Sequence, residues 1–160
     1  MSVASTKAFY SKMAAGLLLA VAIADVVTGE EGAEERRSLL AGIRELPAAM
    51  EVVITRRELV GEAARQFAPS RRYWALVGNG ANRIAAREVR IKLSELCYKS
   101  IACDATEDKK HIDLSSEPLI LVCAAGLTGS TADDVAKEVA IFRAHKAAPI
   151  VIADEGDRRF

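Results

Sequence analysis

The 160-residue sequence lacks a net charge, because 22 lysines and arginines balance 22 aspartates and glutamates. Proteins that bind nucleic acid or an anionic membrane usually carry a basic excess. We therefore expect no nucleic-acid partner and no membrane partner. Hydrophobic residues make up 51% of the chain, which excludes a disordered protein and leaves room for one domain with an ordinary core.

Cysteine is scarce as well, with only Cys97, Cys103 and Cys123. An odd count without short paired spacing argues against a disulfide framework. A zinc site built from these residues and His111 would normally include a Cys-x-x-Cys pair, which is missing. All three cysteines lie in or beside apolar segments, where cysteine behaves as a small buried hydrophobe. We expect no bound metal.

A hydrophobic run long enough to cross a bilayer is also missing. Residues 13–24 are almost entirely apolar and follow Lys7 and Lys12. The run ends in Ala22-x-Ala24, which imitates the cleavage site of a secretory signal peptide. It is shorter than the about 20 apolar residues that a membrane span needs. The alternative is a buried helix that begins at Ser5 or Thr6 and ends near residues 25–29.

The chain shows two different sequence patterns, one before and one after about residue 70. The first 70 residues show helical patterns over residues 5–27, 34–46 and 48–67, with Pro47 as the first residue of a new helix and a break near Thr55. From Tyr73, short apolar runs at 73–77, 100–103, 118–123 and 149–153 alternate with helical patterns at 82–98 and 130–145. Continuous apolar strands between helices predict a parallel sheet buried on both faces.

The predicted fold is therefore α/β: a three-layer, doubly wound parallel sheet, flavodoxin-like, preceded by an N-terminal helical segment. Right-handed crossovers place the helices on both faces of such a sheet. Binding sites in these folds lie at the carboxyl ends of the strands.

The helix expected at residues 82–98 carries Glu88, Lys92 and Glu95 on one face, at spacings of four and three. A partly buried carboxylate beside a cation can exchange protons with a substrate. The alternative is an exposed stripe of ion pairs without a function. The lone His111 follows the second strand and suits proton transfer near pH 7, although an exposed loop histidine explains it equally simply.

Residues 126–134 follow the third strand and begin a helix. Free amides there, beside the hydroxyls of Thr128, Ser130 and Thr131, are typical of a phosphate-binding loop. A capping box between Ser130 and Asp133 explains the same residues without a ligand.

A glycine turn, Gly78-Asn79-Gly80, follows the first strand. It lacks the third glycine of a dinucleotide fingerprint, and Asp104 is an acidic partner by position only. We therefore expect no nicotinamide cofactor.

Three stretches resemble one family. Residues 3–9 read Val-Ala-Ser-Thr-Lys-Ala-Phe, residues 44–47 read Arg-Glu-Leu-Pro, and Lys92-x-x-Glu95 precedes His111 by sixteen positions. These stretches are similar to the sugar isomerase (SIS) domain family, specifically to the isomerase half of the glucosamine-6-phosphate synthases (glutamine–fructose-6-phosphate aminotransferases). The resemblance implies that residues 1–70 are the end of a preceding SIS repeat plus linker helices. Residues 71–160 would be a SIS domain truncated at its C-terminus.

The resemblance also implies a cytoplasmic homodimer that binds fructose 6-phosphate or glucosamine 6-phosphate without a cofactor. Glu95 would be the base that moves a proton between C1 and C2 of the sugar, with electrostatic support from Lys92. His111 would assist ring opening in the active site of a neighbouring subunit. The residues implied to contact the sugar or its phosphate are Val3, Ser5, Thr128, Ser130 and Thr131.

The sequence departs from the family where Ile112-Asp113 replaces the usual Gly-Pro after the histidine. The phosphate-binding sheet of the first repeat and the family's C-terminal tail with its Schiff-base lysine are missing, so we expect the isolated chain to be inactive. The alternatives are a non-catalytic module that binds or senses a sugar phosphate, and a dimerisation domain.

Overall fold

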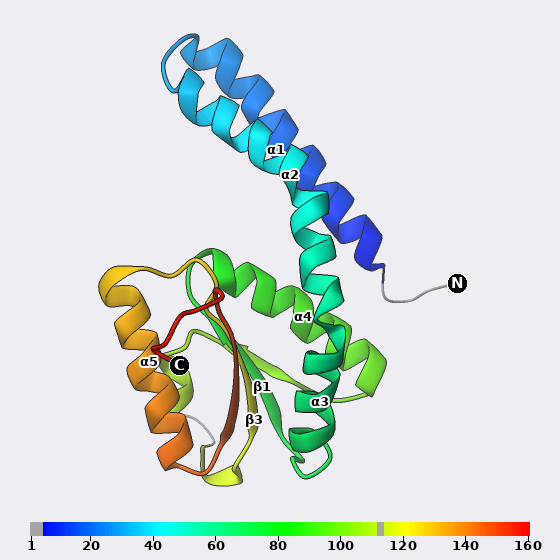
Figure 1. Ribbon diagram of the computed structural model, residues 1–160, viewed down its shortest axis with the longest axis vertical. Coiled ribbons are helices and arrows are strands. Elements are labelled where there is room, and N and C mark those ends of the chain that lie inside the picture. The colour runs from blue at the N-terminus through cyan, green and yellow to red at the C-terminus, as the bar shows by residue number, and fades with distance from the viewer. Residues whose placement is uncertain (1–4, 112–113) are drawn as a thin grey trace. The chain divides into compact units, whose positions relative to one another are not determined.

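The computed structural model describes residues 5–111 and 114–160 (Figure 1). For Lys110 and His111 it describes the backbone but not the side chains. The chain divides into two compact units, residues 1–61 and 62–160. The boundary expected from the sequence between residues 70 and 71 remains a prediction.

The first unit contains the helices α1 (Thr6–Thr28) and α2 (Ala33–Thr55). Arg36 is buried at the turn between them. Its Nε donates to the Asp25 carboxylate at 2.5 Å, and its Nη1 donates to the Glu31 carbonyl at 2.6 Å. Its Nη2 donates to the carbonyl of Gly29. The Arg36 guanidinium thus stabilises the turn between α1 and α2, because it offers several hydrogen-bond donors in a fixed planar arrangement.

Three sequence expectations fail in this unit. Pro47 was expected to begin a helix, but it lies inside α2, which continues past it although proline removes one main-chain hydrogen bond. The run at residues 13–24 was judged too short for a membrane. The helix α1 extends beyond that run on both sides, and by length and composition alone it is long and apolar enough to cross a bilayer. The mostly buried core helix of a soluble protein and a signal sequence near the N-terminus pass the same test. Val21 is the buried residue of α1 and most of its other side chains are exposed, so α1 is not the buried helix that the sequence suggested as the alternative.

The second unit contains a four-stranded sheet in the order β2-β1-β3-β4, with every neighbouring pair parallel. The predicted doubly wound parallel sheet is confirmed. Each predicted strand starts and ends within two residues of the observed one. The elements in chain order are α3 (Arg57–Phe67), which begins before the unit boundary, then β1 (Trp74–Gly78), α4 (Ala81–Cys97), β2 (Ala102–Asp104), the short 3-10 helices η1 (Asp108–His111) and η2 (Leu114–Ser116), β3 (Leu119–Cys123), α5 (Gly129–Ala144) and β4 (Ala148–Ile152).

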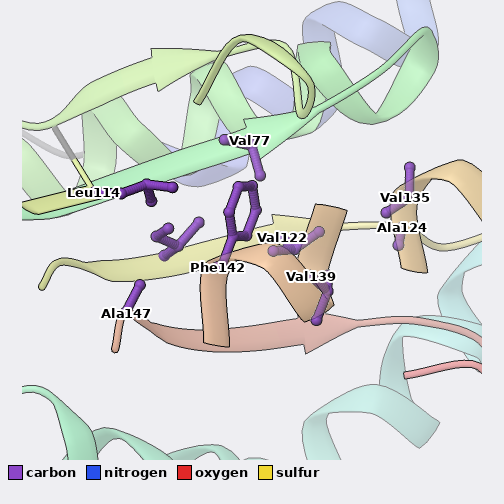
Figure 2. Close-up of a cluster of buried hydrophobic side chains, with 9 residues drawn as sticks. Val77, Leu114, Val122, Ala124, Val135, Val139, Phe142 and Ala147 are labelled. Atoms are coloured by element: carbon purple, nitrogen blue, oxygen red, sulfur yellow. The ribbon is translucent and has the colours of Figure 1, made fainter. Parts of the chain in front are cut away.

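Alternate strand residues supply the two sides of the core, because successive side chains in a strand point to opposite faces. One cluster joins Val77 and Val122 to the side chains of α5, with Phe142 at its centre (Figure 2). The other cluster contains Leu76 and Cys123, which are next in sequence to Val77 and Val122, and joins them to the side chains of α4. The helices α4 and α5 therefore cover opposite faces of the sheet (Figure 1).

The chain leaves β1 toward β2 on one side and leaves β3 toward β4 on the other. β1 and β3 stay paired up to their last residues, Gly78 and Cys123, and the loops that follow them lead to opposite sides of the sheet. This switch point is the usual ligand position in such sheets. Gly78 ends β1 at this point. A Cβ atom there would lie 2.6 Å from the Asn82 carbonyl oxygen of α4, so only glycine lets the helix begin this close to the strand.

Replacing Gly78 with alanine should lower the free energy of unfolding by about 1–3 kcal/mol, because the new methyl group meets backbone atoms that cannot yield easily. Gly42→Ala is the matched control. Gly42 lies within α2 with open space around it, so alanine there should raise stability by about 0.5–1 kcal/mol. Urea denaturation followed by circular dichroism measures both. A stability of Gly78→Ala equal to that of the unmodified chain contradicts the close approach.

Phe142→Ala should lower the free energy of unfolding by about 3–5 kcal/mol. Phe142 is fully buried in the cluster between the sheet and α5, and its removal leaves a cavity there. Leu96→Ala, at a leucine that is 65% exposed on α4, should cost far less. Fluorescence of Trp74, the single tryptophan, reports unfolding of the sheet directly. Equal losses in the two variants would contradict the assignment of the core.

Candidate functional site

The loops that follow β1, β2 and β3 are tied together at the carboxyl edge of the sheet. The side-chain oxygen of Asn79 accepts a hydrogen bond from the Thr106 amide at 3.0 Å. The side-chain nitrogen of Asn79 donates to the Glu107 carboxylate at 3.1 Å. Asn82 Nδ2 donates to the Ala125 carbonyl at 2.8 Å. Short polar side chains therefore hold three loops in register where a ligand is expected.

A cavity of about 410 Å³ lies at this edge. Thr106 lines it with a fully buried side chain, and its hydroxyl has no hydrogen-bond partner among residues 5–109 and 114–160. Buried hydroxyls in proteins are nearly always hydrogen-bonded, so this one calls for an explanation. The lining residues are Asn79, Thr106, Glu107, Thr131, Asp134, Val135, Lys137 and Glu138.

The charged side chains of the cavity are mainly carboxylates, contributed by Glu107, Asp134 and Glu138. Lys137 is the cation of the lining, and its Nζ donates to Asp134 at 3.0 Å. The ammonium group is thus already engaged. A phosphate dianion inside this cavity would meet carboxylates at short range and would be repelled.

The start of α5 differs from the predicted capping box. The helix begins at Gly129 with Thr128 as the N-cap, and the Thr128 side chain makes no capping hydrogen bond. The box between Ser130 and Asp133 is wrong because both residues already lie inside the helix. Asp133 instead pairs with Arg159 at 3.7 Å. The first amides of α5 therefore have no side-chain cap, and helix starts of this kind attract anions.

Of the three hydroxyl residues expected near a phosphate, Thr131 lines the cavity, and Thr128 and Ser130 immediately precede it in the chain. All three are exposed. The preceding loop is held by Asp154, whose carboxylate accepts the Gly126 amide at 2.9 Å. The loop is thus positioned from the segment after β4, and its hydroxyls remain accessible.

The structure brings Glu88, Lys92 and Glu95 together on α4. Lys92 Nζ lies 3.2 Å from Glu88 Oε1 and 3.7 Å from Glu95 Oε2, and the three side chains are only 18–32% exposed. These two carboxylate oxygens are buried and receive no hydrogen bond from the described residues. A half-buried ammonium between two carboxylates is more strongly coupled than a fully solvated surface pair.

This α4 cluster and the α5 loop do not converge. Lys92 lies eleven residues beyond Ala81, the first residue of α4, so it is about 16 Å along the helix from the carboxyl edge. The two helices also cover opposite faces of the sheet. One small ligand therefore cannot touch Glu95 and Thr131 of the same chain.

The remaining predicted site residues are placed as follows. His111 ends η1, which contacts α5, and its side chain lies outside the described part of the structure. Val3 lies outside the described residues, and Ser5 is the exposed N-cap of α1. Asp104 ends β2. Sequence reasoning considered Asn79 only as part of a glycine turn and missed the cavity residues Thr106 and Glu107, for which the available signal was their position just after β2.

Cys123 is buried and Cys103 is partly buried in the sheet, whereas Cys97 is exposed at the end of α4. The expectation that all three cysteines behave as buried hydrophobes is therefore wrong for Cys97. Burial raises the pKa of Cys123, and burial together with the neighbouring Asp104 raises the pKa of Cys103. Both thiols consequently stay protonated at neutral pH, and a protonated thiol is a poor metal ligand and a poor nucleophile. Within residues 5–111 and 114–160, no group of three or more His, Cys, Asp or Glu side chains is placed to hold a metal ion.

Comparisons with known proteins indicate to which family the chain belongs. No family model matches the sequence. The chain is 30% identical, over 98% of its length, to glutamine–fructose-6-phosphate aminotransferase of Corynebacterium efficiens, and 33% identical, over 97%, to that of Thermus thermophilus. It spans about a quarter of the length of these relatives, 26% in each case.

Among solved structures, the C-terminal domain of glucosamine-fructose-6-phosphate aminotransferase from Francisella tularensis superimposes with a TM-score of 0.74 at 20% identity, covering 94% of this chain and 42% of that one. The shared fold and the relatives' names agree with the motifs at residues 3–9 and 92–111. The chain is therefore a member of the SIS domain family, related to the C-terminal part of the glutamine–fructose-6-phosphate aminotransferases.

Proposed function

We propose that this chain is a sugar-phosphate-binding SIS module that supplies part of the isomerase site of a glucosamine-6-phosphate synthase-like enzyme acting on fructose 6-phosphate. The Glu88–Lys92–Glu95 cluster on α4 carries the proposal, because it matches the Lys-x-x-Glu motif of the resemblance and is half-buried. The names of the relatives, which specify fructose 6-phosphate as their substrate, support it.

The chemistry requires a base that takes a proton from one sugar carbon and returns it to the next. Glu95 suits this role, since a carboxylate held partly away from water can both accept and release a proton. Lys92, 3.7 Å from Glu95 Oε2, supplies positive charge beside the base, where it can stabilise the negative charge that develops on the substrate oxygen when the sugar carbon loses its proton. Fixed charge of this kind is most effective where water is excluded.

The rest of such a site has to come from outside this module. Glu95 lies far along α4 from the α5 loop, and the relatives are about four times as long as this chain. We propose that further SIS residues and a second copy complete the pocket, with Val3 and Ser5 beside the sugar and His111 contributed to the neighbouring subunit. This arrangement implies a homodimer and an inactive isolated chain.

A second candidate is a non-catalytic module that binds or senses a sugar phosphate. The uncapped start of α5 favours it, because the free amides of residues 129–131 can bind phosphate together with the hydroxyls of Thr128, Ser130 and Thr131. In either case we propose a cytoplasmic location, with α1 as a helix of a soluble protein. The similarity to the relatives extends over 98% of the chain and therefore includes α1.

In a complete enzyme that contains this module, Glu95→Gln should lower turnover of fructose 6-phosphate by about 100- to 10,000-fold, because the carboxylate base is lost while the shape of the side chain is retained. KM should change little. Glu88→Gln is the matched control, since Glu88 contacts the same lysine from the previous turn. Steady-state kinetics measures both. Unchanged turnover in Glu95→Gln removes this residue from the catalytic role.

Ser130→Asp should abolish binding of fructose 6-phosphate to the chain, because the new carboxylate stands where the phosphate is proposed. A carboxylate in the first turn of a helix is itself stabilising, so loss of binding would not reflect unfolding. Ser115→Asp, at an exposed serine of η2, makes the same change of charge elsewhere. Isothermal titration calorimetry measures the affinity of each variant for fructose 6-phosphate. An unchanged affinity in Ser130→Asp contradicts a phosphate site at this loop.

A further inference from the structure

We propose that the open edge of β2, together with three arginines of α4 beside it, binds an extended acidic peptide as an additional strand. The three arginines are Arg83, Arg87 and Arg90, and they form an arginine stripe along the helix. The peptide that fits carries carboxylates on alternate residues. This binding does not depend on the sugar-phosphate site proposed above, because the stripe and the Lys92 cluster lie on opposite flanks of α4.

The arginine stripe follows from helical spacing. Residues at positions i, i+4 and i+7 lie on one side of a helix, so Arg83, Arg87 and Arg90 share one flank of α4. Their Cα atoms are separated by about 6 Å and about 4.5 Å along the helix axis. Arg87 is exposed, and Arg83 and Arg90 are half-buried. The stripe is therefore a row of positive charge on the surface.

The stripe lies beside β2. The helix α4 contacts this strand, and Cys103 of β2 packs against the cluster that joins α4 to the sheet. Burial and the neighbouring Asp104 raise the pKa of Cys103, whereas the charges of all three arginines act on it in the opposite direction. Interactions between charges weaken with distance, so the guanidinium groups have to be near the strand. A ligand at β2 therefore meets them.

The guanidinium groups of the stripe are available to a ligand. Within the part of the chain that the structure describes, none of the three arginines forms an ion pair with a carboxylate. Lys92 on the other flank of α4, in contrast, lies between two glutamates. A guanidinium stays charged at any physiological pH, and its planar set of donors matches the two oxygens of a carboxylate. Carboxylates are thus the complementary groups.

The outer edge of β2 accepts a strand. In the described sheet β2 pairs with β1 alone, and its first residue, Ala102, is exposed. An edge strand presents N–H and C=O groups to which an extended peptide can bind. Alternate residues of a strand lie about 6.6 Å apart on one face, which is close to the spacing of the arginines. Carboxylates on alternate residues of the peptide can therefore reach successive arginines.

A peptide fits this surface better than a nucleic acid does. Three cations supply few phosphate contacts, and phosphate contacts provide most of the affinity of non-specific nucleic-acid binding. A phosphate backbone also lacks the regularly spaced N–H and C=O groups that pair with a strand edge. An acidic peptide matches the charge of the stripe and the main chain of β2 at the same time.

The test is a fluorescence-anisotropy titration of the full chain with a labelled peptide of four Thr-Glu repeats. Saturable binding is expected. Arg87→Glu, at an exposed residue, should weaken it at least tenfold, and circular dichroism checks that the variant is folded. Arg143→Glu makes the same charge change at an exposed residue of α5, on the opposite face of the sheet, and should change the affinity less than twofold. Equal effects of the two substitutions overturn the assignment to the stripe.

Further probes test the mode of binding. In nuclear magnetic resonance spectra of the isotope-labelled chain, the Thr-Glu peptide should shift the amides of residues 102–104. A peptide of four Pro-Glu repeats keeps the charges but lacks half of the main-chain N–H donors, and it should bind at least tenfold more weakly. Equal affinity for the two peptides overturns strand addition. Tighter binding of a single-stranded oligothymidylate than of the Thr-Glu peptide overturns the inference in favour of nucleic acid, and absence of saturable peptide binding overturns it outright.

Discussion

Burial of both faces of the parallel sheet is the constraint on which the second unit depends. Strand residues alternate between the two faces, so each strand has to supply apolar side chains in both directions. Val77 and Leu76 are adjacent in β1, both are fully buried, and they belong to opposite clusters. A helix is required on each face to cover them. The divergence of the loops at the carboxyl edge, and with it the cavity, follows from placing α4 and α5 on opposite sides.

The helix α4 illustrates how one element meets several demands. Ala86, Val89 and Leu93 pack on the sheet. One flank carries Glu88, Lys92 and Glu95, which pair with one another. The other flank carries arginines whose charges act on the thiol of Cys103 at the edge strand. Opposite flanks of a single helix thus present different charge patterns, and only the first of them matches the motif of the family.

Much of the fold could be predicted from local patterns. Continuous apolar runs between helical segments indicated parallel strands, and the strands lie within two residues of their expected positions. Burial along α4 was less predictable. Ile84 and Leu96 lie 53% and 65% exposed, whereas the small Ala86 on the same helix is fully buried. The site was harder still, since Asn79, Thr106 and Lys137 come from three separate elements. Their proximity depends on strand order, which residue spacing does not encode.

The guanidinium of Arg36 has a consequence for the order of folding. All of its partners lie within eleven residues of it in the chain, from Asp25 to Glu31. The sheet, in contrast, joins residues far apart, such as Gly78 with Cys123. Contacts between near neighbours form faster than distant ones, because less chain has to be ordered first. The helical hairpin can therefore assemble while later segments are still being synthesised, whereas the parallel strands have to wait for β3.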